Sequence, residues 1–229
     1  TDDEAWLQGI RVHSDHRGAA HGVAMVEDLF DWCHKRGATV ARSLVFGWNG
    51  AGMGQSRAVG FDPVAACRWV HPDPDADASV DGFDVVEAPA TAWRFWTHSD
   101  ARTELSGLAR ASDDAWALSE LDRGRLETLA GEGRAVALVD DGTRAMTVRA
   151  GTREHEAETV AEYVIGAWAD STAAGGLIGA IRADAAACGA DTARVFVPDT
   201  VRVVSDVAAT RCAIAETTNY VFAADLTGG

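Results

Sequence analysis

The residues best suited to chemistry in this sequence form one short loop near its start, Arg17-Gly18-Ala19-Ala20-His21-Gly22. Small residues at the start of a helix leave several backbone N–H groups without partners, at the positive end of the helix dipole. Such a loop suits a phosphate or pyrophosphate group, which Gly22 would let approach the backbone and Arg17 would contact by charge. A tight turn with a surface arginine is the alternative interpretation.

The elements that must position this loop follow from the spacing of apolar residues. A helix is predicted after the loop, because Val23, Val26, Leu29 or Phe30, and Cys33 share one face, and Gly37 suits its C-terminus. Around it we expect a strand at 6–12, a strand at 40–48, a short helix at 52–58 and a strand at 61–70. Strands that alternate with helices predict an α/β protein whose sheet contains parallel neighbours.

The last part of the chain repeats this order of elements. Its turn Gly189-Ala190-Asp191-Thr192-Ala193-Arg194 resembles Gly37-Ala38-Thr39-Val40-Ala41-Arg42, with four identical positions. This predicts an internal duplication, with chance similarity as the alternative. There we expect a strand at 162–169, a helix at 173–187 with Leu177, Ile178, Ile181 and Ala185 inward, a strand at 192–197, a helix capped by Asp199 and a strand at 220–224. Ahead of it we expect a strand at 92–96, helices at 100–110 and 118–130, and a hairpin at 134–149.

Residues 71–90 have the composition of a linker, because three prolines and several aspartates gather there. They predict a division into a first segment, 1–70, and a second domain, 91–229. The second domain has a front half ahead of its repeat, whereas the first segment has none. The sequence therefore predicts that an upstream portion of the first domain lies outside this chain.

A second motif supports the phosphate-binding loop. Asn49 follows the second strand, and Gly60-Phe61 comes eleven residues later. Strand, Arg-x-x-small-x-Gly loop, helix, strand, Asn and Gly-Phe, in this order, resemble the GNAT superfamily of acyl-CoA N-acyltransferases. The resemblance covers residues 5–70 and extends to 91–229 only by element order, as a degenerate second copy. It implies a GNAT-like mixed sheet flanked by helices in two tandem copies, the first lacking its N-terminal half in this chain.

The resemblance implies acetyl-CoA as co-substrate and assigns its contacts residue by residue. Asn49 would contact the pantetheine arm. The loop amides, Arg17, Gly18, Ala19, Ala20, His21 and Gly22, would hold the pyrophosphate. The backbone of the preceding strand, at Ile10, Arg11 and Val12, would bind the acyl carbonyl and the pantetheine arm.

Three positions depart from the family pattern. Ala20 replaces a glycine, which the backbone tolerates if φ stays negative. Ser56 stands where the family often has a tyrosine general acid, and Gln8 stands where a glutamate base is common. Ser56 is the candidate acid, although its hydroxyl protonates a thiolate less readily than a phenol does. His13, His16 and His21 are substitutes for the base, because histidine exchanges protons near neutral pH; solvated loop residues are the alternative.

The implied function is transfer of an acetyl group to an amine, either a small molecule or a peptide. The alternative is a catalytically silent module that binds acyl-CoA or a partner, favoured by Gln8 and Ser56. In the second copy the corresponding turn begins with Asp170. Because this carboxylate would repel pyrophosphate, we expect that copy to bind no CoA.

Composition bounds the remaining function classes. The net charge is −15, and Lys35 is the only lysine among 20 basic residues. This arginine-rich acidity resembles haloarchaeal proteins, with an acidic protein from a GC-rich genome as the alternative, and it disfavours nucleic acid. Neither a membrane span nor a basic signal sequence is apparent, so we expect a cytoplasmic protein, with an oligomer left open. The cysteines are far apart, which favours buried apolar residues over a metal site or a disulfide: Cys33, Cys67, Cys188 and Cys212.

Overall fold

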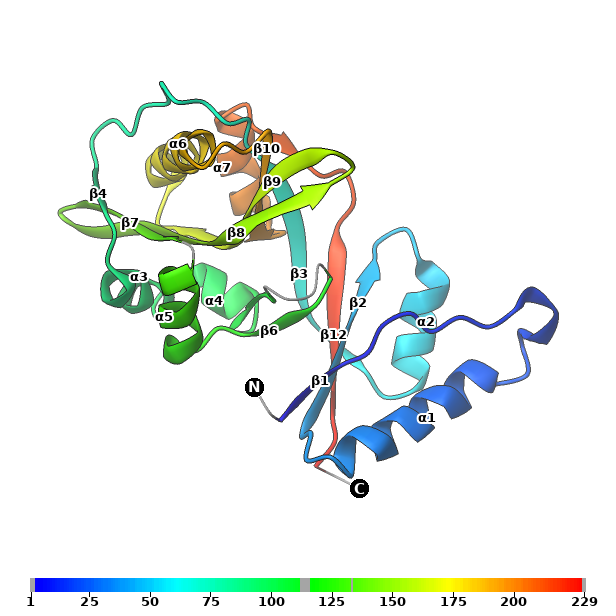
Figure 1. Cartoon of the computed structure of the whole chain (residues 1–229). Helices are drawn as coiled ribbons and strands as arrows, with labels where there is room; N and C mark the ends of the chain where they lie inside the picture. The colour runs from blue at the N-terminus through cyan, green and yellow to red at the C-terminus, as the bar shows by residue number, and fades with distance from the viewer. Residues whose placement is uncertain (1–2, 112–115, 133, 228–229) are drawn as a thin grey trace.

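The computed structural model of this chain describes residues 3–111, 116–132 and 134–227, and Figure 1 shows its mixed sheet flanked by helices. The sheet runs in the order β1-β2-β12-β3-β10-β9-β8-β7-β4, with β11 pairing β3 beside that path. Its strands are β1 (Glu4–Trp6), β2 (Val40–Phe46), β3 (Asp62–His71), β4 (Asp84–Val86), β7 (Arg134–Asp140), β8 (Gly142–His155), β9 (Glu158–Trp168), β10 (Thr192–Pro198), β11 (Ala213–Ile214) and β12 (Asn219–Asp225). Strands β5 (Leu108–Arg110) and β6 (Leu118–Glu120) form a separate pair.

The helices cover both parts of this sheet. They are α1 (His21–His34), α2 (Gly50–Ala58), α3 (Pro89–Trp96), α4 (Asp100–Glu104), α5 (Arg123–Glu132), α6 (Ser171–Ala187) and α7 (Val201–Ala209), with a short 3-10 turn at Ser14–His16. Helices α1 and α2 lie on one side of strands β1, β2 and β12. Strand β6 and the second part of the chain lie on the other side of these strands (Figure 1). No helix in the described ranges combines the length and apolar character needed to cross a membrane.

The sheet joins the two ends of the chain. Strand β12 lies between β2 and β3 and is antiparallel to both. The later residues of β3 also pair with β10 and β11 from the second part. The division at 71–90 stays a prediction, but it does not divide the sheet. One part of that stretch lies against α6, because Arg182 donates to the Asp73 carbonyl at 2.9 Å. Another part, β4, joins the sheet by pairing with β7.

Several predicted elements are confirmed. In α1 the side chains of Val26 and Cys33 are buried, and Gly37 takes a left-handed φ of 89° just after the helix. In α6 the predicted inward face is buried: Leu177, Ile178, Ile181 and Ala185. The hairpin of β7 and β8 also forms as predicted, with Gly142 at its turn. The four cysteines are free thiols, two of them buried.

The prediction of a strand at 92–96 is wrong, because this stretch belongs to helix α3. Pro89 begins the helix, a position that needs no backbone N–H. Ala92 and Trp96 lie one turn apart and are both fully buried. The aromatic residues suggested a strand, whereas their helical spacing decides the structure.

The two helices predicted next are shorter than expected. Helix α4 ends at Glu104, because Ser106 and Gly107 take left-handed φ values of 53° and 78°. Helix α5 begins only at Arg123, after β6, where the Asp122 carboxylate accepts from the Arg125 N–H at 2.7 Å. Local hydrogen bonding and positive φ therefore override the longer apolar patterns.

The predicted cap of α7 is also wrong. Thr200, and not Asp199, caps this helix, since its hydroxyl accepts from the Val203 N–H at 3.3 Å. Asp199 instead forms an ion pair with Arg68 of β3 at 2.9 Å. Its carboxylate is thereby used to join the second part of the chain to β3.

Asp184 gives the stability of the second part a pH dependence. Its side chain is 4% exposed and accepts hydrogen bonds from Arg134 at 2.6 Å, Arg149 at 2.8 Å and the Tyr163 hydroxyl at 2.7 Å. Burial alone raises the pKa of Asp184, but these hydrogen bonds outweigh it and hold the pKa below its usual value. A carboxylate with a lowered folded pKa stabilises the fold above its unfolded pKa, near 3.9, and loses this as pH falls through the folded pKa.

We therefore expect the free energy of unfolding to fall below about pH 4 in the native protein. This acid limb should be shallower in Asp184→Asn, which is also less stable at pH 7. Denaturant unfolding between pH 3 and pH 7 measures both effects. Asp141→Asn, at an exposed position in the hairpin turn, is the control. A parallel pH profile in Asp184→Asn and the native protein would contradict this role.

Candidate functional site

The candidate site lies where β1 and β2 part. The two strands are parallel and pair only as far as Trp6 opposite Arg42, followed by one bond from the Leu7 N–H to the Arg42 carbonyl at 2.8 Å. Gly9 then takes a left-handed φ of 76°, and the chain leaves β2. The predicted strand at 6–12 is thus wrong in extent. Because β2 continues to Phe46, its edge faces a gap beyond Arg42.

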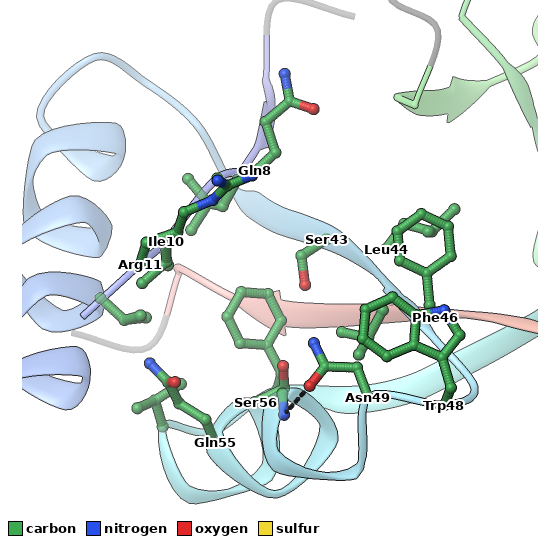
Figure 2. A pocket seen from close by; sticks show the side chains of 17 residues that line it. Gln8, Ile10, Arg11, Ser43, Leu44, Phe46, Trp48, Asn49, Gln55 and Ser56 are labelled. Atoms are coloured by element: carbon green, nitrogen blue, oxygen red, sulfur yellow. Dashed lines mark hydrogen bonds between the residues drawn. The ribbon is translucent and has the colours of Figure 1, made fainter. Parts of the chain in front are cut away.

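A cavity of about 460 Å³ fills this gap. Its walls come from residues 7–11, from β2 and from helices α1 and α2. Ser43 of β2, Asn49 at the N-cap of α2 and Ser56 in the last turn of α2 point into it, and Phe46 and Trp48 lie at one side (Figure 2). The cavity is therefore an apolar cleft with a few polar groups, as is typical of small-molecule sites.

The structure brings several of the predicted site residues to this cavity. Ile10, Arg11, Asn49 and Ser56 all line it, and so does Gln8. These positions come from three separate stretches of sequence. Their assembly around one cavity is what the predicted acyl-CoA site requires.

Two predicted contacts have other partners in the structure. Val12 does not line the cavity, and its carbonyl accepts from Arg17 Nε at 3.1 Å. Asn49 caps α2, since its Oδ1 accepts from the Gly52 N–H at 2.9 Å (Figure 2). The Asn49 side chain thus offers its amide N–H groups, and not its oxygen, to a ligand.

The structure adds polar and aromatic groups that the sequence did not single out. Ser43 shares its face of β2 with the buried residues Ala41 and Val45, so a polar residue at an inward strand position was its signal. Trp48 lines the cavity with 72% of its surface exposed, and nothing in the local sequence separated it from a core tryptophan.

The predicted phosphate loop ends at an uncapped helix. Ala20 is the N-cap of α1 and makes no side-chain cap, and among the described residues the backbone N–H groups of 18–22 have no carbonyl partner. The condition of a negative φ, under which the backbone tolerates alanine in place of glycine, is not met at Ala20. Its φ is 57°, and Gly18 is also left-handed at 80°. These turns set the amides of the loop at the start of the helix dipole.

The start of α1 adjoins the cavity. A Cβ on Gly22 would lie 2.4 Å from Nε2 of Gln55, and Gln55 lines the cavity. A side chain at position 22 would therefore have to displace the flexible Gln55 amide where α1 approaches α2. The uncapped start of α1 thus lies beside Gln55 of the cavity wall, although none of the predicted loop residues 17–22 lines the cavity itself.

The charge of this region opposes that of the whole chain. Between Glu4 and Glu27 the only acid is Asp15, which faces His13 at 3.7 Å. Arg11 and Arg17 have no carboxylate partner within the described ranges. An anion is therefore favoured here despite a net charge of −15.

The three histidines proposed as a base lie outside the cavity lining. His13, His16 and His21 are exposed on the loop, with ring centroids 6.1 Å apart for the first two and 6.3 Å apart for the last two. The structure places them with the phosphate loop, not with Gln8 and Ser56.

In the predicted duplication helix α6 corresponds to α1, and the two helices differ at their starts. Asp170 caps α6, accepting from the Ala173 N–H at 2.9 Å, and also pairs with Arg144. The hydrogen bond from Ala173 is the largest cause that lowers the pKa of Asp170. A carboxylate therefore occupies the start of α6, where α1 leaves its amides free. Among the described residues no cluster of three His, Cys, Asp or Glu could hold a metal ion.

Comparisons with known proteins identify the fold. No family model and no curated protein matches the chain. One similar solved structure is a GCN5-related N-acetyltransferase from Sphaerobacter thermophilus, with a TM-score of 0.62 and 10% identity over 95% of this chain and 72% of that one. A second is a GCN5-related N-acetyltransferase from Anabaena variabilis, with a TM-score of 0.51 and 9% identity over 98% of this chain and 55% of that one. Another is a tandem GNAT protein from the clavulanic acid biosynthesis pathway, solved without AcCoA, with a TM-score of 0.54 and 13% identity over 99% of this chain and 76% of that one.

At these identities the likeness shows the fold alone. The chain has the α/β fold of GNAT N-acetyltransferases, with a mixed sheet flanked by helices. It spans little more than half the length of the Anabaena protein. The fold class expected from the sequence is confirmed at this level, and the two tandem copies stay a prediction.

Proposed function

We propose that this chain is an N-acetyltransferase that moves the acetyl group of acetyl-CoA to an amine. The observation that carries the proposal is the cavity between the parted strands β1 and β2, whose wall residue Gln55 lies beside the uncapped start of α1. A thioester with a long arm and a pyrophosphate needs this combination of an apolar cleft and an anion site.

The residues of the cavity suit the parts of acetyl-CoA. The amides of 18–22 and the charge of Arg17 would hold the pyrophosphate. The pantetheine arm carries amide groups, which can pair with the open edge of β2 at Leu44, the next residue on the same edge as the Arg42 carbonyl. Asn49 would donate to the arm from the start of α2, which it caps. The acetyl group would then lie near Gln8 and Ser43.

The reaction needs only one bond exchange. The nitrogen of a neutral amine attacks the acetyl carbonyl carbon, a C–N bond forms and the C–S bond breaks. The amine loses one proton, the departing thiolate gains one, and the products are an amide and free CoA. Ser56 is the candidate donor of the proton to the thiolate, since it lines the cavity. Gln8 cannot act as a base, so the proton of the amine would leave through water.

We also propose that the chain contains two copies of one fold, the second without a CoA site. Each copy pairs an arginine at the same place in the repeated turn with a glutamate of the parallel neighbouring strand. Arg42 pairs with Glu4, and Arg194 pairs with Glu162. Asp170 at the start of α6 supports the loss of CoA binding in the second copy.

The second candidate function is a silent module that binds acyl-CoA without transfer. Gln8 and Ser56 favour it, because neither is a ready acid or base. Both candidates require acetyl-CoA binding, and only the acetyltransferase requires release of free CoA in the presence of an amine.

Calorimetric titration with acetyl-CoA, followed by a thiol-release assay with a panel of amines, separates the two candidates. Binding with amine-dependent thiol release supports the acetyltransferase. Binding without release on any amine supports the silent module. Absence of binding contradicts both. Ser56→Ala tests the acid: we expect kcat to fall by about tenfold while acetyl-CoA affinity is kept.

A further inference from the structure

A second cavity lies across the gap from the first. Its volume is about 360 Å³, and three of its lining residues are aromatic: Trp6 of β1, Phe46 of β2 and Trp116. It shares five lining residues with the first cavity, Gln8, Gly9, Arg11, Leu44 and Phe46. The two cavities therefore meet at the gap between β1 and β2.

The cavities open on opposite faces of the sheet. Helices α1 and α2 contribute to the first cavity and not to the second. The second takes only Leu44 and Phe46 from β2, which share one face, whereas the first also takes Ser43 and Val45 from the other. Trp116 belongs to the second part of the chain, so that part supplies one wall.

The aromatic side chains form an ordered cluster. Phe46 is stacked on Trp48 with ring centroids 5.6 Å apart and an interplanar angle of 7°. It also meets Trp116 edge to face, at 5.5 Å and 77°. Trp48 and Trp116 remain 72% and 47% exposed, although tryptophan is usually largely buried. This much aromatic surface beside a cavity is typical of a binding site.

Arg11 limits what the second cavity can hold. It lines both cavities and has no carboxylate partner in the described part of the chain. A permanent cation is therefore disfavoured, although aromatic walls alone would suit one. A nearby positive charge also favours the neutral form of a bound amine. The neutral amine is the form that can attack a thioester.

We infer that this second cavity binds the acceptor, and that the acceptor is an amine carrying a flat aromatic ring on a short chain. The inference rests on the proposed acetyl transfer for the role of the amine. The ring would pack against Trp6, Phe46 and Trp116 in offset or edge-to-face contact. The amino group would reach the gap, where the two cavities meet and the acetyl group of the proposed site lies. A volume of about 360 Å³ has room for one or two rings with a short chain.

The test compares two amines of the same carbon skeleton, 2-phenylethylamine and 2-cyclohexylethylamine, by calorimetry with and without saturating CoA. We expect the flat phenyl compound to bind about tenfold more tightly. Trp116→Ala should weaken its binding by about tenfold, and Trp116→Phe by about threefold or less. The control is Trp32→Ala, because Trp32 is 53% exposed on α1 and lines neither cavity. It should change nothing.

The outcomes separate this inference from the proposed function. Equal affinity for the two amines, or an unchanged affinity in Trp116→Ala, overturns the aromatic acceptor. So does failure of the phenyl compound to bind to protein that has bound CoA. If CoA does not bind but the phenyl compound binds in a Trp116-dependent way, the proposed function fails and the aromatic cavity stands. If neither binds, both are overturned.

Discussion

Ala20→Asp should abolish measurable acetyl-CoA binding, with an affinity loss of at least about 100-fold. The reason is the contrast between two helix starts: Asp170 occupies the amides of α6, whereas the amides of α1 are free. A carboxylate at position 20 would lie among those free amides and repel the pyrophosphate. Aspartate tolerates the left-handed φ of 57° found there, and a negative charge at a helix start stabilises the helix.

Two matched variants make this result specific. Ala20→Asn has the same size and the same tolerance of positive φ but no charge, so it should lose about tenfold or less in affinity. Ala20→Gly keeps the amides free and relieves the left-handed alanine, so its affinity should be at least that of the native protein. Calorimetric titration measures all three, with circular dichroism to report helix content. Equal affinity of the Asp and Asn variants would show that no anion binds at the start of α1.

Glu162→Gln should lower the free energy of unfolding by about 3–5 kcal/mol. Glu162 is 4% exposed and faces Arg110 at 2.5 Å, Arg153 at 3.8 Å and Arg194. Burial lowers the pKa of Arg110 to about 10, while Glu162 opposes that shift. Removal of the single carboxylate would leave three positive charges together, one of them in a side chain that is 1% exposed. Uncompensated buried charge is among the most destabilising changes in a protein.

Urea unfolding of Glu162→Gln and of Glu158→Gln measures this effect. Glu158 begins the same strand but is exposed, so its substitution should change the stability by less than about 0.5 kcal/mol. A loss below about 1 kcal/mol in Glu162→Gln would mean that solvent already screens the cluster. Glu162 should matter for stability and not for acetyl-CoA affinity, since it lines neither cavity.

The parts of this structure that the sequence could predict are those determined by local pattern. The apolar face of α1, the inward residues of α6 and the hairpin turn at Gly142 all follow from spacing within a short window. The sequence also predicted backbone N–H groups without partners before α1, and among the described residues the amides of 18–22 have no carbonyl partner. Asn49 and Ser56, singled out by their spacing, line one cavity, and their roles stay predictions.

Other features depend on contacts between distant residues. The position of β12 between β2 and β3 follows from pairing that no local pattern encodes. The left-handed φ of Ala20 contradicts the usual preference of alanine, so the surrounding structure must impose it. Trp116 lies far along the chain from Phe46, and the second cavity therefore cannot be seen until both segments are folded. The early end of the predicted strand at 6–12 could have been found from the sequence, because Gly9 lies inside it and a glycine weakens a strand.

The place of β12 in the sheet also bears on the order of events as the chain leaves the ribosome. Strand β2 forms one wall of the cavity, and among the residues that the structure describes its only strand partner over Leu44 to Phe46 is β12. Because β12 is synthesised after the whole second part, this edge of β2 stays open until then. Such long-range pairing gives slow folding and a nascent chain that is prone to mispairing. The cavity wall that β2 forms therefore gains its neighbouring strand only after β12 has been synthesised.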